Sequence, residues 1–186
     1  MPESAGPITA LEAAKRNVEA AIRMLFTGED TLPVHLVAAA ALRVLHGLVQ
    51  DGHAQAWDDV IKLFLMPEGE AAFRRAINDT ETLAKYAEQD PGAMLQEFPA
   101  ERNDLEIAIS CLYLECLDAA PSVEAQAFLW WFATMHPHVM RADRFFKASL
   151  PPDDFQWLQG APRAKQLQFG DTVLRLVRRN RLTAQS

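Results

Sequence analysis

The sequence lacks the residue patterns that mark several classes of enzyme. No glutamate is followed three places later by a histidine, so the Glu-x-x-His pairs of di-iron helical bundles are absent. No two histidines are four places apart, and the cysteines have no neighbouring histidine with which to form a zinc pattern. A Gly-x-Ser-x-Gly turn, a phosphate-cradling glycine-rich loop and a dinucleotide fingerprint are also missing. We therefore expect no metal and no cofactor, and we assign no catalytic residue.

Cysteine is scarce, and long apolar runs are absent. The two cysteines, Cys111 and Cys116, lie five apart in one expected helix. They point about 140° away from each other and cannot pair, so we expect reduced packing residues. The longest stretch of low charge, 31–42, is shorter than the ~18 to 20 apolar residues that a bilayer crossing needs. The N-terminus has neither the basic region nor the apolar core of a signal peptide. These features predict a cytoplasmic protein without a membrane partner.

Charge is unevenly distributed along the chain, which has a net charge of −7. Residues 1–140 hold 9 Lys/Arg against 21 Asp/Glu, a balance of −12, whereas residues 141–186 hold 9 against 4, a balance of +5. The acidic part should repel nucleic acid, and the basic end could form a local positive surface.

The hydrophobic pattern predicts helices throughout, because no strand-like alternation occurs and Gly and Pro fall between helical segments. The first helix should start at a Thr9 cap, with Glu12 completing a capping box, and end at Gly28. We predict an all-α, single-domain bundle of six to eight helices. Its expected limits are a disordered N-terminus at 1–8, a helical domain at 9–180 and a disordered tail at 181–186.

The second expected helix, from a Thr31 cap to Gln50, is apolar nearly all round. Such a helix is normally the central one of a bundle, so we expect it to be the most buried element. Its strongly polar residues are His35, Arg43 and His46. The two histidines lie eleven apart, which puts them within about 20° on one face but ~16 Å apart along the axis. They could line a ligand-binding groove beside Arg43, or each could form a hydrogen bond at the edge of the core.

Further helices are expected after this one. The predicted ranges are 55–66, 68–88 with a break at 78–80, 101–117, 125–135 with a Ser122 cap, a helix reaching about 150, and 171–180. The segment Asp90-Pro91-Gly92 predicts a turn. The helix 125–135 should end at His136, where a cationic imidazole is favoured by the helix dipole.

The C-terminal part carries the candidate interaction residues. Phe128, Trp131 and Phe132 share a face with core spacing, while Trp130 points elsewhere, so we expect Trp130 to be partly exposed. The last helix carries an apolar stripe surrounded by arginines, of which Arg175, Arg178 and Arg179 are the candidates for contact with a partner. Because no aromatic residues are interleaved with these arginines, nucleic acid is the less favoured partner.

Three stretches, 8–40, 85–91 and 131–137, resemble a group of functionally unassigned bacterial helical proteins of this length. Where that group is expected to have Lys-His-Ala-Asp, this chain has Lys85-Tyr86-Ala87-Glu88, so any role of that histidine is absent. The segment is also distantly similar to HEPN domains. Active HEPN ribonucleases carry an arginine followed by a histidine after four to six intervening residues, and no arginine of this chain is placed so; Arg43 and His46 are only three apart. The resemblance thus implies a related fold without the ribonuclease chemistry.

Two functional hypotheses remain. The first is a non-enzymatic helical interaction protein, a homo-oligomer or the partner of another protein, with the C-terminal half as its contact surface. The second is a HEPN-related binder or enzyme acting on a small molecule, nucleotide or RNA. It would use a groove near His35 and Arg43, with His46 and Lys85 as further ligand-binding residues. The missing catalytic patterns favour the first hypothesis.

Overall fold

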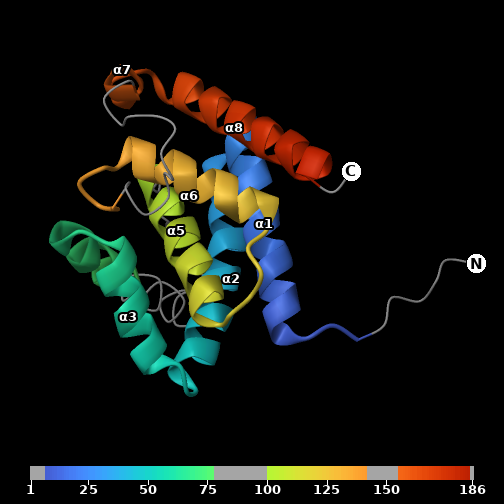
Figure 1. The fold of residues 1–186 in the computed structure, drawn as a ribbon, viewed down its shortest axis with the longest axis vertical. Coiled ribbons are helices and arrows are strands. Elements are labelled where there is room, and N and C mark those ends of the chain that lie inside the picture. The colour runs from blue at the N-terminus through green and yellow to red at the C-terminus, as the bar shows by residue number, and fades with distance from the viewer. Residues whose placement is uncertain (1–6, 78–99, 142–154, 185–186) are drawn as a thin grey trace, which may run out of the picture.

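The computed structural model describes residues 7–77, 100–141 and 155–184, and these ranges contain eight helices and no strand (Figure 1). The all-α bundle is confirmed. The predicted break at 78–80, the turn at 90–92 and the end of the helix reaching 150 lie outside the described residues, as does the candidate Lys85.

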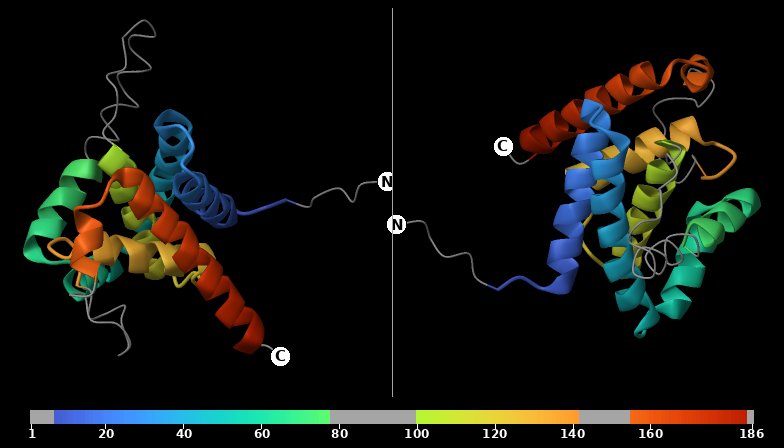
Figure 2. Two further views of the ribbon diagram at one scale, coloured as in Figure 1. Left: turned by 90° about the horizontal axis from the view of Figure 1, so that it is seen from above. Right: turned by 180° about the vertical axis from the view of Figure 1, so that it is seen from behind.

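The first two helices, α1 (Ala10–Thr27) and α2 (Thr31–Gln50), lie side by side and antiparallel (Figure 2). The predicted Thr9 cap is confirmed, because the Thr9 hydroxyl accepts a hydrogen bond from the Glu12 amide at 3.1 Å. Gly28 ends α1 in the left-handed region, with φ 75°, as predicted for a glycine at a helix C-terminus. The cap predicted for α2 is wrong by one residue. The carboxylate of Asp30, one residue before Thr31, accepts from the Leu32 amide at 2.8 Å and caps the helix.

The next helices form a bent arm at one side of the bundle (Figure 1). They are α3 (Ala54–Phe64) and a helix at 67–77 that runs to the end of the described range. Pro67 starts the second helix in the first turn, where a proline is tolerated. The junction pairs with the chain after α6 (Val123–Met135), since the Met66 amide donates to the Val139 carbonyl at 2.9 Å. Gly69 is required there, because a Cβ would lie 2.1 Å from the Val139 oxygen.

The central helix is α5 (Ala100–Cys116), and the prediction that α2 is the most buried element was wrong. Twelve of the seventeen residues of α5 are buried, and it packs against α1, α2, α3 and α6. The α2 sequence is apolar nearly all round, but α1 and α5 cover only one of its faces. Its outer face is exposed, with Leu32 and Leu36 at 42% and 61% exposure.

The helices α6 (Val123–Met135), α7 (Gln156–Gln159) and α8 (Arg163–Ala184) close one side of the bundle, with α8 crossing α1 and α6 (Figure 1). The Ser122 cap of α6 is confirmed. The last helix is longer than the predicted 171–180 and includes residues 181–184, which we had assigned to a tail. It begins after Pro162 and continues through Gly170, whose Cα faces the Phe26 ring so closely that a Cβ would lie 2.3 Å from it.

By length and composition alone, α2 would be long and apolar enough to cross a membrane, which corrects the expectation that no apolar run reaches that length. This is weak evidence, because the core helix of a soluble protein meets the same criterion. One face of α2 packs along α1 and α5, and its buried His35 lies against a carboxylate of α5.

Candidate functional site

The beginning of α5 carries a group of polar side chains inside the bundle. Asn103, Asp104, Glu106 and Ser110 are all 1% exposed or less. Asp104 and Glu106 are two residues apart, which turns their side chains about 200° from each other on a helix. The two carboxylates therefore face different neighbours and form two separate clusters of charge.

The first cluster joins α5 to α8. The two guanidinium nitrogens of Arg163 donate to the two oxygens of Asp104 at 2.8 and 2.6 Å, a bidentate pair. The guanidinium also lies over the ring of Trp131, 5.3 Å from its centroid. His136, the residue that ends α6 as predicted, has its Nε2 3.8 Å from Asp104. The Asp104 carboxylate is fully buried, so Arg163 supplies its charge compensation where water cannot.

The second cluster joins α5 to α2. Nδ1 of His35 lies 3.0 Å from one Glu106 oxygen. Arg102 precedes Glu106 by one helical turn, and its Nε lies 3.2 Å from the other oxygen. Next to it, the Asn103 amide donates to the Thr31 carbonyl at 2.9 Å, in the first turn of α2. His35 is thus a buried partner of a carboxylate and does not face solvent.

His46 also faces α5, as the shared helix face of the two histidines predicted. Its Nδ1 lies 2.7 Å from the Tyr113 hydroxyl, and the Tyr113 ring packs on Trp57 at 4.3 Å. Arg43, in contrast, is exposed on the outer face of α2 and is not brought together with the two histidines. The sequence left two interpretations open, a ligand-binding groove or hydrogen bonds at the edge of the core. Both histidines have their contacts within the bundle, in agreement with the second interpretation.

The geometry of these clusters suits the joining of helices. Both carboxylates lie inside the bundle, and each has cationic or imidazole partners, including one from another helix. Arg102, Asp104, Glu106 and Arg163 were not among the residues predicted from the sequence. Three of them belong to a polar run at 102–106, Arg-Asn-Asp-Leu-Glu. This run directly precedes the segment 107–114, in which all eight residues are buried. In the described ranges, no three His, Cys, Asp or Glu side chains group as metal ligands would.

Both cysteines are buried and free, as predicted. Burial raises the pKa of the Cys111 thiol far above its ordinary range. Burial, together with the nearby Glu115 carboxylate, raises the pKa of Cys116 to about 12. Thiols held protonated at neutral pH are poor nucleophiles and poor metal ligands.

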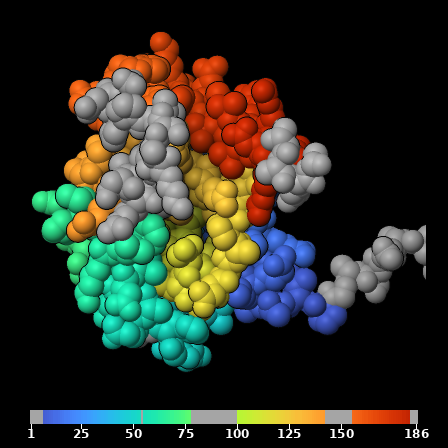
Figure 3. All heavy atoms as spheres, in the orientation of Figure 1, coloured from blue at the N-terminus to red at the C-terminus, as the bar shows by residue number. Residues whose placement is uncertain are grey.

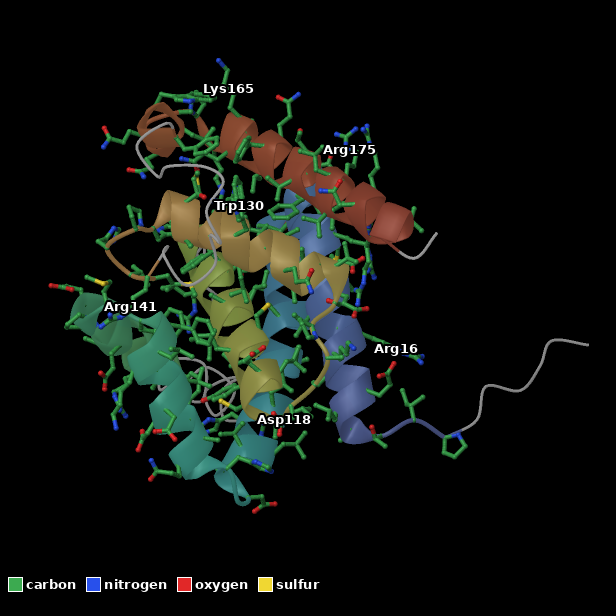
Figure 4. All side chains as sticks on the ribbon, viewed as in Figure 1. Arg16, Asp118, Trp130, Arg141, Lys165 and Arg175 are labelled. Carbon is green, nitrogen blue, oxygen red and sulfur yellow. The ribbon has the colours of Figure 1, made fainter. Side chains whose placement is uncertain are left out.

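The aromatic residues of the C-terminal part form a cluster between α6 and α8 (Figure 4). Trp130 is half-buried there, with its ring centroid 5.7 Å from Phe155 and 5.6 Å from Phe169. The tryptophan that is largely exposed is Trp157 of α7, at 64%. The predicted partial exposure of Trp130 is confirmed, but its partners lie 25 and 39 positions away and could not be identified from the sequence.

The candidate arginines of α8 lie on two different faces. Arg178 faces the bundle and donates to Glu124 of α6 at 2.6 Å; Arg23 of α1 donates to the same oxygen at 3.1 Å. Arg175 and Arg179 are exposed and lie about 60° and 100° around the helix from Arg178. Arg175, labelled in Figure 4, pairs with Asp171 one turn before. Leu176 and Leu182 lie beside them at 52% and 69% exposure. We call these four residues, Arg175, Leu176, Arg179 and Leu182, the outer face of α8.

No protein-family model, no curated protein and no solved structure matches the chain.

Proposed function

We propose that the protein is a non-enzymatic helical interaction protein that associates with further copies of itself through the C-terminal half of α8. The observation that carries the proposal is the outer face of α8. It places two large apolar side chains, Leu176 and Leu182, at the surface. Exposed apolar patches that are rimmed by polar residues mark interaction sites.

The way α8 is attached supports this role. Its first half is tied down by the Asp104–Arg163 pair and by the packing of Gly170 against Phe26. From residue 175 to residue 182 no side chain is buried. In the space-filling view, α8 lies along one end of the molecule, at the surface (Figure 3). The helix therefore presents arginines and leucines at the surface of an acidic molecule.

The buried clusters support a non-enzymatic role, because their charged groups are used between helices. The groove near His35 and Arg43 required by the HEPN-related alternative has no supporting observation, since His35 is buried against Glu106 while Arg43 is exposed. We further propose a cytoplasmic location, in keeping with two free, buried thiols.

The proposal is tested by light scattering coupled to size exclusion. The variant Leu176→Ser/Leu182→Ser should have a lower mass than the wild type at the same concentration, because it loses the apolar contact but keeps the Arg178–Glu124 pair. Leu63→Ser, at an exposed leucine of α3, is the matched control and should keep the wild-type mass.

A wild type that stays monomeric at high micromolar concentration would contradict the proposal. Salt-resistant, sequence-selective RNA binding that is lost in the double variant would also contradict it. Contacts made only to phosphate, in contrast, should be weak and fall steeply with salt.

A further inference from the structure

The side of α2 that faces away from the bundle carries an exposed stripe, which is apolar along most of its length. Leu32, Leu36, Ala40, Arg43 and Gly47 are all exposed, and helix geometry places them within about 40° of the direction of Leu36. We call these five residues the outer stripe of α2. The helices α1 and α5 pack against the other side of α2, and a Cβ at Gly47 would meet no atom within 4 Å. Leu32 and Leu36 remain exposed although α8 crosses this end of α2 (Figure 2).

Opposite charges lie at matched positions on the two sides of Leu36. Arg43 is seven residues after Leu36, about 10 Å along the helix axis, and Glu29 is seven residues before it, where the chain enters the helix. Both side chains are exposed. In the part of the chain that the structure describes, neither of them forms an ion pair. The stripe therefore has an unpaired positive charge on one side of Leu36 and an unpaired negative charge on the other.

We infer that the outer stripe binds the outer stripe of a second copy, with the two α2 helices antiparallel about a two-fold axis at Leu36. Residues at equal distances on opposite sides of Leu36 then face each other, as a two-fold contact requires. Leu36 lies on Leu36 of the second copy, Leu32 faces Ala40, and Arg43 faces Glu29. A large side chain meets a small one and each arginine meets a carboxylate, so the stripe is complementary to itself.

Charge disfavours the other ways of pairing the stripe with itself. A parallel pair would place Arg43 against Arg43 and Glu29 against Glu29. An antiparallel pair centred on Ala40 would bring Glu29 level with Asp51, a second acidic residue, because each lies eleven residues from Ala40. Like charges in contact at an interface are costly, so the arrangement centred on Leu36 is favoured.

This contact goes beyond the proposed function, because it uses α2 and not the outer face of α8. The two contacts can therefore be separated by mutation. The variant Leu176→Ser/Leu182→Ser lacks the exposed leucines of α8 but keeps the outer stripe of α2. The tests that follow are made in this variant, so that the α2 contact is measured by itself.

The position of the axis is tested by disulfide cross-linking. Leu36→Cys should give a disulfide-linked dimer on mild oxidation, because helices packed about 8 to 10 Å apart bring facing Cα atoms within disulfide range. The native Cys111 and Cys116 are buried and should not compete. Ala40→Cys is the matched control. Its two copies would lie about 12 Å apart along the axis and should cross-link at least about tenfold more slowly. Faster cross-linking of Ala40→Cys than of Leu36→Cys would contradict the inference.

The two ion pairs are tested by charge reversal. Arg43→Glu and Glu29→Arg should each raise the dissociation constant for self-association about tenfold, because each brings like charges together twice in the dimer. An equimolar mixture of the two variants should restore the original affinity, since the mixed dimer has opposite charges at both positions. Sedimentation equilibrium measures these constants, and a mixture as weak as either variant alone would contradict the pairing.

The remaining outcomes separate this inference from the α8 contact. If the Leu176→Ser/Leu182→Ser protein is monomeric at high micromolar concentration, the α2 contact is absent and the inference fails. The α8 contact is judged independently, by comparing this protein with the wild type. Co-sedimentation with phosphatidylcholine vesicles that is lost in Leu36→Ser would assign the stripe to a lipid surface and overturn the inference. Melting temperatures that agree among the variants, at a concentration where all are monomeric, would show that the substitutions leave the fold intact.

Discussion

Removing Arg163 should destabilise the protein more than removing the charge of Asp104, although the two side chains form one pair. In Arg163→Leu, the Asp104 carboxylate keeps its charge in a position with no exposure, where water cannot replace the guanidinium. Breaking a buried ion pair from one side costs about 3 to 5 kcal/mol for this reason. Typical domains have a total stability of ~5 to 15 kcal/mol, so the loss is a large part of it.

In Asp104→Asn, the unpaired group is instead the Arg163 guanidinium. Its side chain is 28% exposed and lies over the Trp131 ring, so it can regain water and keep one favourable contact. We expect a smaller loss, about 1 to 3 kcal/mol, which is the range for an unsatisfied hydrogen-bonding group. The double variant Asp104→Leu/Arg163→Leu should be more stable than Arg163→Leu alone, because it contains no buried charge without a partner.

The assay is urea unfolding followed by far-UV circular dichroism, with the three variants and the wild type at one pH. Equal slopes would show that the midpoints report stability. The reasoning is refuted if Arg163→Leu loses less than about 1 kcal/mol, the value typical of exposed pairs. It is also refuted if Asp104→Asn is the less stable of the two single variants.

Two further predictions concern the pH dependence and the core. Burial opposes ionisation of Glu124, but hydrogen bonds from Arg178, the backbone and Arg23 outweigh it and lower its pKa below the ordinary value of 4.5. Its contribution to stability is therefore complete above that value and is lost as the pH falls through the lowered pKa. The difference in unfolding free energy between the wild type and Glu124→Gln should shrink below about pH 4.5, and an equal difference at pH 7 and at the acid end of a urea series would contradict this. In α2, Leu45→Asp should abolish folding, because Leu45 has no exposure and an unpaired buried carboxylate costs several kcal/mol. Leu36→Asp, on the exposed face of the same helix, should keep the wild-type melting temperature. Equal melting curves for the two variants would show that Leu45 is not buried.

Local patterns were sufficient for most of the fold. Thr9 and Ser122 were identified as caps because a helix start is encoded within four residues, and Gly28 as a stop because the left-handed conformation favours glycine. The rank of burial among helices is a tertiary property. The α2 sequence is the more apolar of the two, and only packing decides that α5, with its charged residues, lies in the centre.

The candidate site was harder to predict, for a related reason. Sequence periodicity correctly put His35 and His46 on one face, but their partners lie on α5, 71 and 67 residues away. The partner of Arg178 is Glu124, 54 residues away, so the charge pattern of α8 alone could not show that this arginine is used within the chain. Long-range pairs of this kind leave no local signal in a single sequence.

The Asp104–Arg163 pair links two positions that are 59 residues apart, and this has a consequence for how the protein is made. At roughly 5 to 20 residues per second, the ribosome adds Arg163 about 3 to 12 s after Asp104. During that interval α1, α2 and α5 are all present, but closing them around Asp104 would enclose a carboxylate whose counter-ion has not been synthesised. Native packing of α5 is therefore postponed until α8 has emerged. The nascent chain must keep the apolar segment 107–114 of α5 away from other chains until then, so a holdase chaperone acting on this segment would have its greatest effect before α8 has emerged.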